Sequence, residues 1–91
     1  MLNELFEIIE DRKANPSEKS YTASLFTEGE DRICQKVGEE AVEVIIAAKG
    51  QGDQRIIEEV SDLFYHTLVL LSAKGLTLGD VEDELRKRHA K

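Results

Sequence analysis

The stretch KVGEEAVEVIIAAKG, residues 36–50, decides the fold class of this chain. Its apolar residues recur with helical spacing, and they cover a sector wider than the stripe of an ordinary surface helix. Three carboxylates, Glu39, Glu40 and Glu43, nevertheless interrupt this apolar surface within five residues. At about 100° of rotation per residue, Lys36, Glu40 and Glu43 form one stripe, and Glu39 lies on its flank. The sequence therefore predicts a mostly buried helix with one narrow acidic sector.

A second helix of the same kind is predicted over residues 54–74. It contains the stretch EEVSDLFYHTLVLL, residues 58–71, whose leucines, valine and phenylalanine give a broad apolar surface. Glu59 and Asp62 are one helical turn apart, so their side chains share a face on the opposite, polar side. This helix also combines a wide apolar arc with a confined group of carboxylates.

The segment GQGD, residues 50–53, predicts a tight turn between these two helices. Gly50 ends the first helix, residues 30–49, and Asp53 is the expected N-cap of the second. Two helices joined by so short a turn pack antiparallel against each other. The centre of the fold is therefore predicted to be an antiparallel helical hairpin.

Folding this hairpin about its turn brings the acidic sectors of the two helices together. Glu43 is then opposite Glu59, Glu40 is opposite Asp62, and the packed helix axes are about 8–10 Å apart. Four like charges at that separation repel one another unless a cation, shared protons or water intervene. Ligands that are all oxygen suit Mg²⁺, with Mn²⁺ as the alternative, rather than Zn²⁺. The competing interpretation is that the carboxylates are only the solvated face of the hairpin.

The rest of the chain predicts two flanking helices, residues 2–13 and 78–88. Thr77 is a good N-cap for the second of them, with Asp80 in the position of a capping box. The polar segment between Asn15 and Gly29 predicts a loop with one short turn at residues 21–26. Strands are not expected, so the predicted fold is all-α, in a single domain over residues 1–91.

Composition narrows the classes of function. The 91 residues carry a net charge of −7, which argues against nucleic acid as the main partner because phosphate binding needs a basic surface. Cys34 is the only cysteine, so no internal disulfide forms, and this residue is expected to be buried or to lie on a helix face. Neither a signal peptide nor a membrane-spanning stretch is recognisable. These observations predict a cytoplasmic protein. The broad apolar arcs of the central helices also predict a homodimer.

Three stretches resemble the phosphoribosyl-ATP pyrophosphatases of histidine biosynthesis, a family within the MazG-like superfamily of all-α nucleoside triphosphate pyrophosphatases. They are SYTASLF from Ser20, RICQKVGEEAVEVIIAAK from Arg32 and EEVSDLFYHTLVLL from Glu58. The resemblance implies a Mg²⁺-dependent hydrolase that converts phosphoribosyl-ATP, a small nucleotide substrate, to phosphoribosyl-AMP and pyrophosphate. It also implies a homodimer whose hairpins form a four-helix core.

The resemblance further implies roles for particular residues. Glu40, Glu43, Glu59 and Asp62 are implied as metal ligands. Glu39 is implied as a carboxylate near the metal that either supports a ligand or takes a proton from water. Candidates for substrate binding are the following: Lys19, Ser20, Tyr21, Thr22, Arg32, Lys36 and His66.

Several alternatives stay open at this point. Lys36 either binds a phosphate oxygen or forms an ion pair with Glu40. His66 contacts substrate, orders a carboxylate or is structural. The basic end, residues 86–91, either reaches a phosphate site or complements the dipole at a helix C-terminus. The function has two rivals: a pyrophosphatase that removes free or damaged nucleotides, and a helical dimerisation module without catalytic activity.

Overall fold

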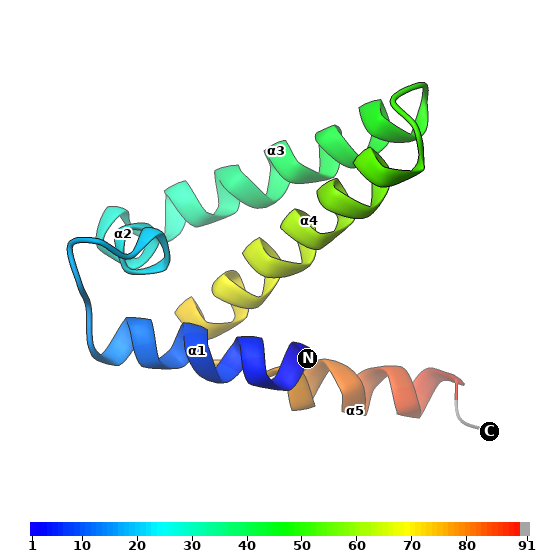
Figure 1. Cartoon of the computed structure of the whole chain (residues 1–91). Coiled ribbons are helices and arrows are strands. Elements are labelled where there is room, and N and C mark those ends of the chain that lie inside the picture. Colours follow the sequence, from blue (N-terminus) through cyan, green and yellow to red (C-terminus); the bar gives the residue numbers. More distant parts are fainter. Residues whose placement is uncertain (90–91) are drawn as a thin grey trace.

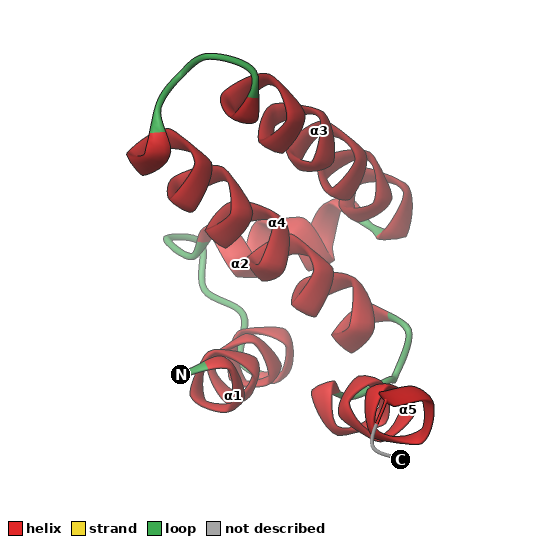
Figure 2. Ribbon diagram, turned by 90° about the vertical axis from the view of Figure 1, so that its right-hand side faces the viewer, coloured by secondary structure: helices red, strands yellow, loops and turns green. Residues whose placement is uncertain are grey.

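The computed structural model describes residues 1–89 of the chain, and helices are the only regular secondary structure over that range. This confirms the predicted all-α class. The long helices α3 and α4 form the antiparallel hairpin, and α1 and α5 lie on the side of α4 that faces away from α3 (Figures 1 and 2). The elements are α1 (Leu2–Ala14), α2 (Tyr21–Glu28), α3 (Glu30–Ala48), α4 (Asp53–Ala73) and α5 (Leu78–His89).

The hairpin turn differs from the prediction in one residue. Asp53 is not the N-cap of α4 but its first helical residue, and Gly52 precedes it as the N-cap with φ of 90°. A glycine adopts this left-handed conformation without the steric cost that a Cβ would bring. Asp53 still favours the helix because its negative charge lies in the first turn, next to the positive end of the helix dipole.

The N-terminus of α5 is built as predicted. The Asp80 backbone N–H donates to Thr77 Oγ1 at 3.1 Å, and the Thr77 backbone N–H donates to Asp80 Oδ2 at 2.9 Å. This reciprocal capping box satisfies two backbone donors that the first helical turn leaves without partners. It explains why a helix without a buried residue begins at a defined position.

The predicted loop before α3 is wrong over residues 21–28, which form the two-turn helix α2. Ser20 is its N-cap, and its side-chain oxygen accepts a hydrogen bond from the Ala23 backbone N–H at 3.1 Å. Leu25 is completely buried. With so few residues, the segment has too little helical periodicity to be recognised from its polar composition. Its helical state depends on the cap and on the burial of Leu25 against the rest of the chain.

The hydrophobic core lies at the end of the hairpin opposite the turn, where α1 and α2 pack across α3 and α4. The turn end of the hairpin extends away from α1 (Figure 1). This arrangement leaves the middle of the hairpin, where the carboxylates lie, outside the main core. The buried apolar residues of the core are Phe6, Ile9, Leu25, Ile33, Leu68 and Val69.

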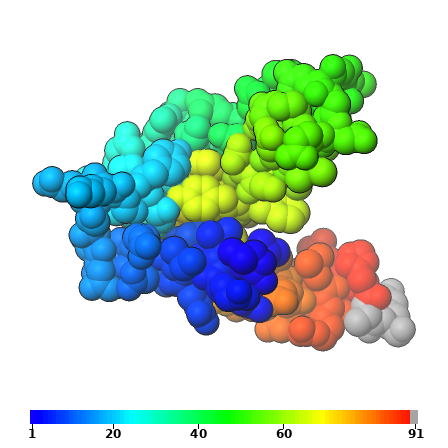
Figure 3. Space-filling model, viewed as in Figure 1, coloured from blue at the N-terminus to red at the C-terminus, as the bar shows by residue number. Residues whose placement is uncertain are grey.

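A large part of the hairpin's apolar surface is exposed in the single chain. Ile45 on α3, for example, is 60% exposed. An apolar groove of about 460 Å³ lies between α4 and α5, and Figure 3 shows a recess between the hairpin and α5. Cys34 is exposed as well, so of the two expectations, a buried cysteine or one on a helix face, the single chain shows the second. The other large exposed apolar residues of the hairpin are Val42, Ile46, Ile57 and Phe64.

None of the described helices combines the length and apolar character needed to cross a membrane.

Two neighbouring isoleucines on α1 test where the core lies. Ile9 is 0% exposed and Ile8 is 45% exposed. Ile9→Ala is expected to lower the free energy of unfolding by about 2–5 kcal/mol, because it leaves a cavity in the core. The matched change Ile8→Ala should cost about 0.5 kcal/mol or less. Urea denaturation followed by circular dichroism measures both, and equal effects would contradict the placement of α1.

Candidate metal centre

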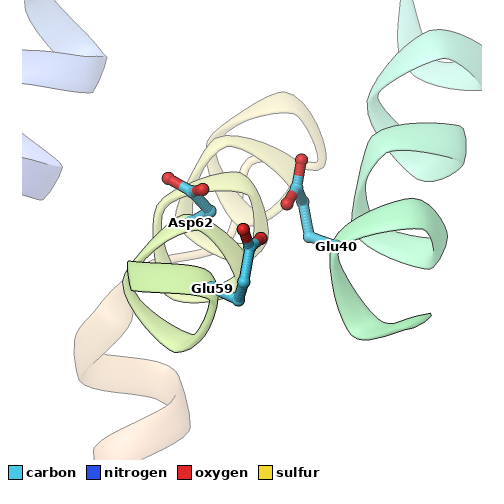
Figure 4. Close-up of side chains that lie close together, drawn as sticks. All are labelled: Glu40, Glu59 and Asp62. Atoms are coloured by element: carbon cyan, nitrogen blue, oxygen red, sulfur yellow. The ribbon is translucent and has the colours of Figure 1, made fainter. Parts of the chain in front are cut away.

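Three carboxylates converge in the middle of the hairpin. Glu40 projects from α3, and Glu59 and Asp62 project from successive turns of α4 (Figure 4). One oxygen of each of these side chains lies within 4.8 Å of an oxygen of each of the others. Glu40 is 9% exposed and Glu59 is 6% exposed, whereas Asp62 is open to solvent. The cluster therefore has a buried side within the hairpin and an accessible side at Asp62.

The predicted register of the hairpin is confirmed for one of its two acidic pairs. Glu40 and Asp62 were expected to be opposite each other, and they belong to the same cluster. Glu43, which is half-buried on the next turn of α3, is not among the three clustered side chains. The structure therefore brings together three of the four predicted ligands, and the role of Glu43 stays a prediction.

Each buried carboxylate of the cluster has a cationic partner from its own helix. Lys36 Nζ lies 3.2 Å from Glu40 Oε1 and 3.6 Å from Glu39 Oε1. Arg55 forms ion pairs with Glu58 and Glu59. These contacts offset the repulsion between Glu40 and Glu59, which would otherwise oppose packing of the two helices. Among residues 1–89, Asp62 makes no ion pair.

Arg55 is a site residue that the sequence analysis did not identify. Its guanidinium contacts the buried Glu59 four residues further along α4. The spacing of four residues between Arg55 and Glu59 could have revealed this contact in the sequence, since residues four apart on a helix are neighbours. For Lys36, the ion pair with Glu40 is observed, which was one of its two predicted roles.

The surroundings of Lys36 keep its ammonium group charged. Burial alone would lower the pKa of Lys36, but its hydrogen bond to Glu40 and the nearby Tyr21 and Glu39 raise the pKa above its ordinary value. Glu39, on the exposed side, accepts a hydrogen bond from Gln35 Nε2 at 2.9 Å. This bond, together with the charge of Lys36, lowers the pKa of Glu39. Glu39 is thus ionised at neutral pH and can accept a proton, but only as a weak base.

Two of the predicted substrate-binding cations lie outside the cluster of carboxylates. Arg32 is on the first turn of α3, with its Nε 4.0 Å from Glu28 Oε1. Lys19 is exposed in the turn before α2. At the C-terminal end of α5, Arg86 and Arg88 pair with Asp83 and Glu84 of the same helix. These pairs within α5 favour the interpretation that the basic end complements the dipole at the helix C-terminus. Lys91 lies outside the described residues.

Two of the other predicted substrate-binding residues, Tyr21 and His66, contact each other. Ser20 caps α2, as described above. Tyr21 Oη lies 3.1 Å from His66 Nε2, and His66 Nδ1 lies 2.7 Å from the Asp62 carbonyl oxygen. The Thr22 hydroxyl is hydrogen-bonded to the hydroxyl of Tyr65, a residue that no sequence pattern singled out. Burial raises the pKa of Tyr65, so its hydroxyl stays protonated at neutral pH.

The donor set fits a hard divalent cation. Three carboxylate oxygens from two rigid helices converge within a few ångströms, and no sulfur or imidazole nitrogen belongs to the group. Mg²⁺ and Mn²⁺ prefer oxygen ligands of this kind. Glu40, Glu59 and Asp62 can therefore hold one of these ions on the face of the hairpin.

The distribution of cations predicts opposite stability effects for two neutralising substitutions. Asp62→Asn removes a charge without a cationic partner from beside two carboxylates, so it should raise the free energy of unfolding by about 0.5 kcal/mol. Glu40→Gln removes the partner of Lys36 and should lower it by about 1 kcal/mol. Urea denaturation at low ionic strength measures both values without added metal. The same sign for both variants would contradict this assignment of charges.

Comparison with known proteins identifies the family of the chain. The family model described as phosphoribosyl-ATP pyrophosphohydrolase matches residues 2–89. The chain is 53% identical over 91 residues to a phosphoribosyl-ATP pyrophosphatase of Clostridium acetobutylicum, and this alignment covers 100% of the chain and 83% of the relative. The chain is also 50% identical over 90 residues to a phosphoribosyl-ATP pyrophosphatase of Lactiplantibacillus plantarum. This alignment covers 99% of the chain and 85% of the relative.

A longer relative matches the chain over part of its length. It is the histidine biosynthesis bifunctional protein HisIE of Caldanaerobacter subterraneus subsp. tengcongensis, which is 53% identical over 91 residues. The alignment covers 100% of the chain but 44% of that protein. With a family model that spans almost every residue and relatives at about half identity over the full chain, this protein belongs to the phosphoribosyl-ATP pyrophosphohydrolase family.

Proposed function

We propose that the chain catalyses the Mg²⁺-dependent hydrolysis of phosphoribosyl-ATP to phosphoribosyl-AMP and pyrophosphate, the second step of histidine biosynthesis. The observation that carries this proposal is the cluster of Glu40, Glu59 and Asp62 on the hairpin of a chain that belongs to this family. A triphosphate is too negatively charged to approach such a cluster without a metal ion between them. Glu40, Glu59 and Asp62 would thus hold the metal ion, whose charge would allow the nucleotide to bind beside them.

In this proposal Glu40, Glu59 and Asp62 hold Mg²⁺, and Glu43 reaches the site as a fourth ligand. A bound ion would neutralise phosphate oxygens and would lower the pKa of a water molecule at the site. The two helices fix the carboxylates through their packing, and Asp62 leaves the solvent side open for the nucleotide. Because Glu40 and Glu59 are buried, they do not need to be ordered when the substrate binds.

The cations beside the cluster supply positive charge that can bind phosphate oxygens. The raised pKa of Lys36 keeps its ammonium group charged at every physiological pH. An ammonium group has three hydrogen-bond donors, so Lys36 can keep its ion pair with Glu40 and still donate to a phosphate oxygen. Arg55 and Arg32 are further candidates for binding the pyrophosphate leaving group. Glu39, ionised and exposed next to Lys36, is the proposed acceptor of the proton from the attacking water.

The proposal includes a homodimer in the cytoplasm. The exposed apolar face of α3 and α4 and the groove between α4 and α5 together form a surface that a monomer would leave in water. A second hairpin offers a matching apolar face, and two hairpins packed together make a four-helix core. The dimer would also bring more of the apolar surface of each chain out of solvent, which stabilises a domain of this small size.

Release of pyrophosphate from phosphoribosyl-ATP is the direct test of the activity. The wild-type protein should release it with Mg²⁺ and should lose activity when the metal is removed with EDTA. Glu59→Gln should lower kcat/KM by about 100-fold or more, because it removes a ligand from the metal. The matched control Glu58→Gln changes the exposed neighbour of Glu59 and should retain activity to within about threefold. Full activity of Glu59→Gln would place the site elsewhere.

A substrate panel distinguishes the two pyrophosphatase functions. Phosphoribosyl-ATP, dUTP and dCTP present the same triphosphate to the metal but differ in base and ribose. The proposal predicts efficient turnover of phosphoribosyl-ATP alone. Efficient turnover of dUTP or dCTP, without turnover of phosphoribosyl-ATP, would assign the chain to the removal of free or damaged nucleotides.

Sedimentation equilibrium tests the dimer. Ile45→Glu places a charge on the exposed apolar face of α3 and should convert a dimer to a monomer at micromolar concentration, because a buried unpaired charge opposes association. Ile8→Lys, an equally drastic change on α1, is the control and should leave the dimer intact. A wild-type protein that sediments as a monomer would overturn this part of the proposal.

A further inference from the structure

Two hydrogen bonds join consecutive residues at the start of α2 to consecutive residues in the middle of α4. Tyr21 is bonded to His66, and Thr22 is bonded to Tyr65. We name these four residues the α2–α4 latch. Apart from them, α2 packs mainly on α1 and α3. The latch therefore ties a short helix to the helix that carries two of the three clustered carboxylates.

The hydrogen-bond pattern fixes the tautomer of His66. Its Nδ1 lies 2.7 Å from the Asp62 carbonyl oxygen, which can only accept a hydrogen bond, so Nδ1 carries a proton. In the neutral ring Nε2 is then an acceptor, and the Tyr21 hydroxyl must be the donor across the 3.1 Å contact. The chain of bonds thus runs from Tyr21 through His66 to the backbone of Asp62.

Burial leaves His66 with no surface to offer a substrate. The residue is 5% exposed, and both ring nitrogens are already hydrogen-bonded. Tyr65 and Tyr21 pack against the imidazole in edge-on arrangements, with ring centroids 4.9 and 6.0 Å away. These contacts hold the ring in one orientation. The role of His66 is consequently to hold Tyr21, rather than to bind a nucleotide.

Tyr21 lies next to the carboxylate cluster. Its hydroxyl is bonded to His66, and His66 is bonded to the carbonyl oxygen of Asp62; Tyr21 itself is half-exposed. Ser20 and Lys19 precede it directly in the chain. Because Lys19 and Ser20 directly precede Tyr21, the position of Tyr21 fixes the position of these residues relative to the carboxylates.

We infer that Tyr21 and His66 are positioning residues that hold the start of α2 beside the carboxylate cluster, with Thr22 and Tyr65 as a second point of attachment. Their hydrogen bond fixes one wall of the nucleotide site before substrate arrives. Without either partner the start of α2 is no longer held in place and substrate binds less tightly. The main effect is therefore a higher KM rather than a lower kcat. The kinetic part of this inference rests on the proposed function, whereas the structural part does not.

The tautomer is tested by nitrogen-15 NMR of the imidazole in the wild-type protein, at a pH where the ring is neutral. The expected result is a proton on Nδ1 of His66 and a hydrogen-bonded acceptor signal from Nε2. In Tyr21→Phe the Nε2 signal should move toward that of an imidazole nitrogen without this bond. A proton on Nε2 in the wild type, or no change in Tyr21→Phe, would overturn the latch even if every variant were inactive.

A double-mutant cycle tests whether the two residues act as one unit. Tyr21→Phe and His66→Phe should each lower kcat/KM for phosphoribosyl-ATP by roughly threefold to tenfold, mainly through KM, as expected for the loss of one hydrogen bond. The double variant should be no worse than the more damaging single one, because both changes remove the same interaction. Effects that multiply in the double variant would mean separate contacts with substrate and would contradict the inference.

Two controls separate this test from loss of folding or of the proposed function. Ser61→Ala removes an exposed hydroxyl on α4 that, within residues 1–89, bonds to the Ile57 carbonyl alone, and it should leave KM unchanged. His66→Gln keeps an acceptor near the position of Nε2 and should restore part of the loss seen with His66→Phe. If the wild type does not hydrolyse phosphoribosyl-ATP, the proposed function fails, while the NMR experiment still decides the latch.

Discussion

Transfer of a carboxylate from water into a protein costs several kcal/mol unless charges or hydrogen bonds offset the loss of hydration. The hairpin buries two of them, Glu40 and Glu59, on facing helices. Lys36 and Arg55 make this possible, because each forms an ion pair with one of these carboxylates from the same helix. The packing of α3 against α4 and the chemistry of the site therefore depend on the same set of charges.

Because these ion pairs lie within single helices, the electrostatics of the site follow from short-range spacing in the sequence. Lys36 precedes Glu40 by four residues, as Arg55 precedes Glu59. Asp62 has no such partner within residues 1–89, and it faces the solvent side. The cluster thus has balanced charge where it is buried and excess negative charge where it is open. In the proposed function, this asymmetry would let a metal ion and its nucleotide approach from the side of Asp62.

Sequence reasoning was most successful where the evidence was local and repeated. Wide apolar arcs predicted α3 and α4, the glycine-rich turn predicted their antiparallel packing, and the register placed Glu40 near Asp62. It failed for α2, because an eight-residue helix has too few turns to show a period and depends on tertiary burial. The start of α4 was predicted one residue too late, with Asp53 in place of Gly52 as the N-cap, since either residue suits a helix start.

The remaining features of the site could not be read from sequence because they depend on tertiary contacts. The bonds between Tyr21 and His66 and between Thr22 and Tyr65 join residues more than forty positions apart, and neither pair shows a periodic signal. The resemblance drew attention to the start of α2 but interpreted it as a loop that contacts substrate. The exposed position of Cys34 depends likewise on which helix faces pair within one chain.

The central claim is that the facing carboxylates of the hairpin bind a divalent metal ion. Anomalous diffraction from crystals soaked in Mn²⁺ tests it most directly, because the signal locates the ion independently of activity. The account predicts a single strong site within coordination distance of Glu40, Glu59 and Asp62. Crystals in which these side chains point apart into solvent, with no anomalous peak between α3 and α4, would contradict it.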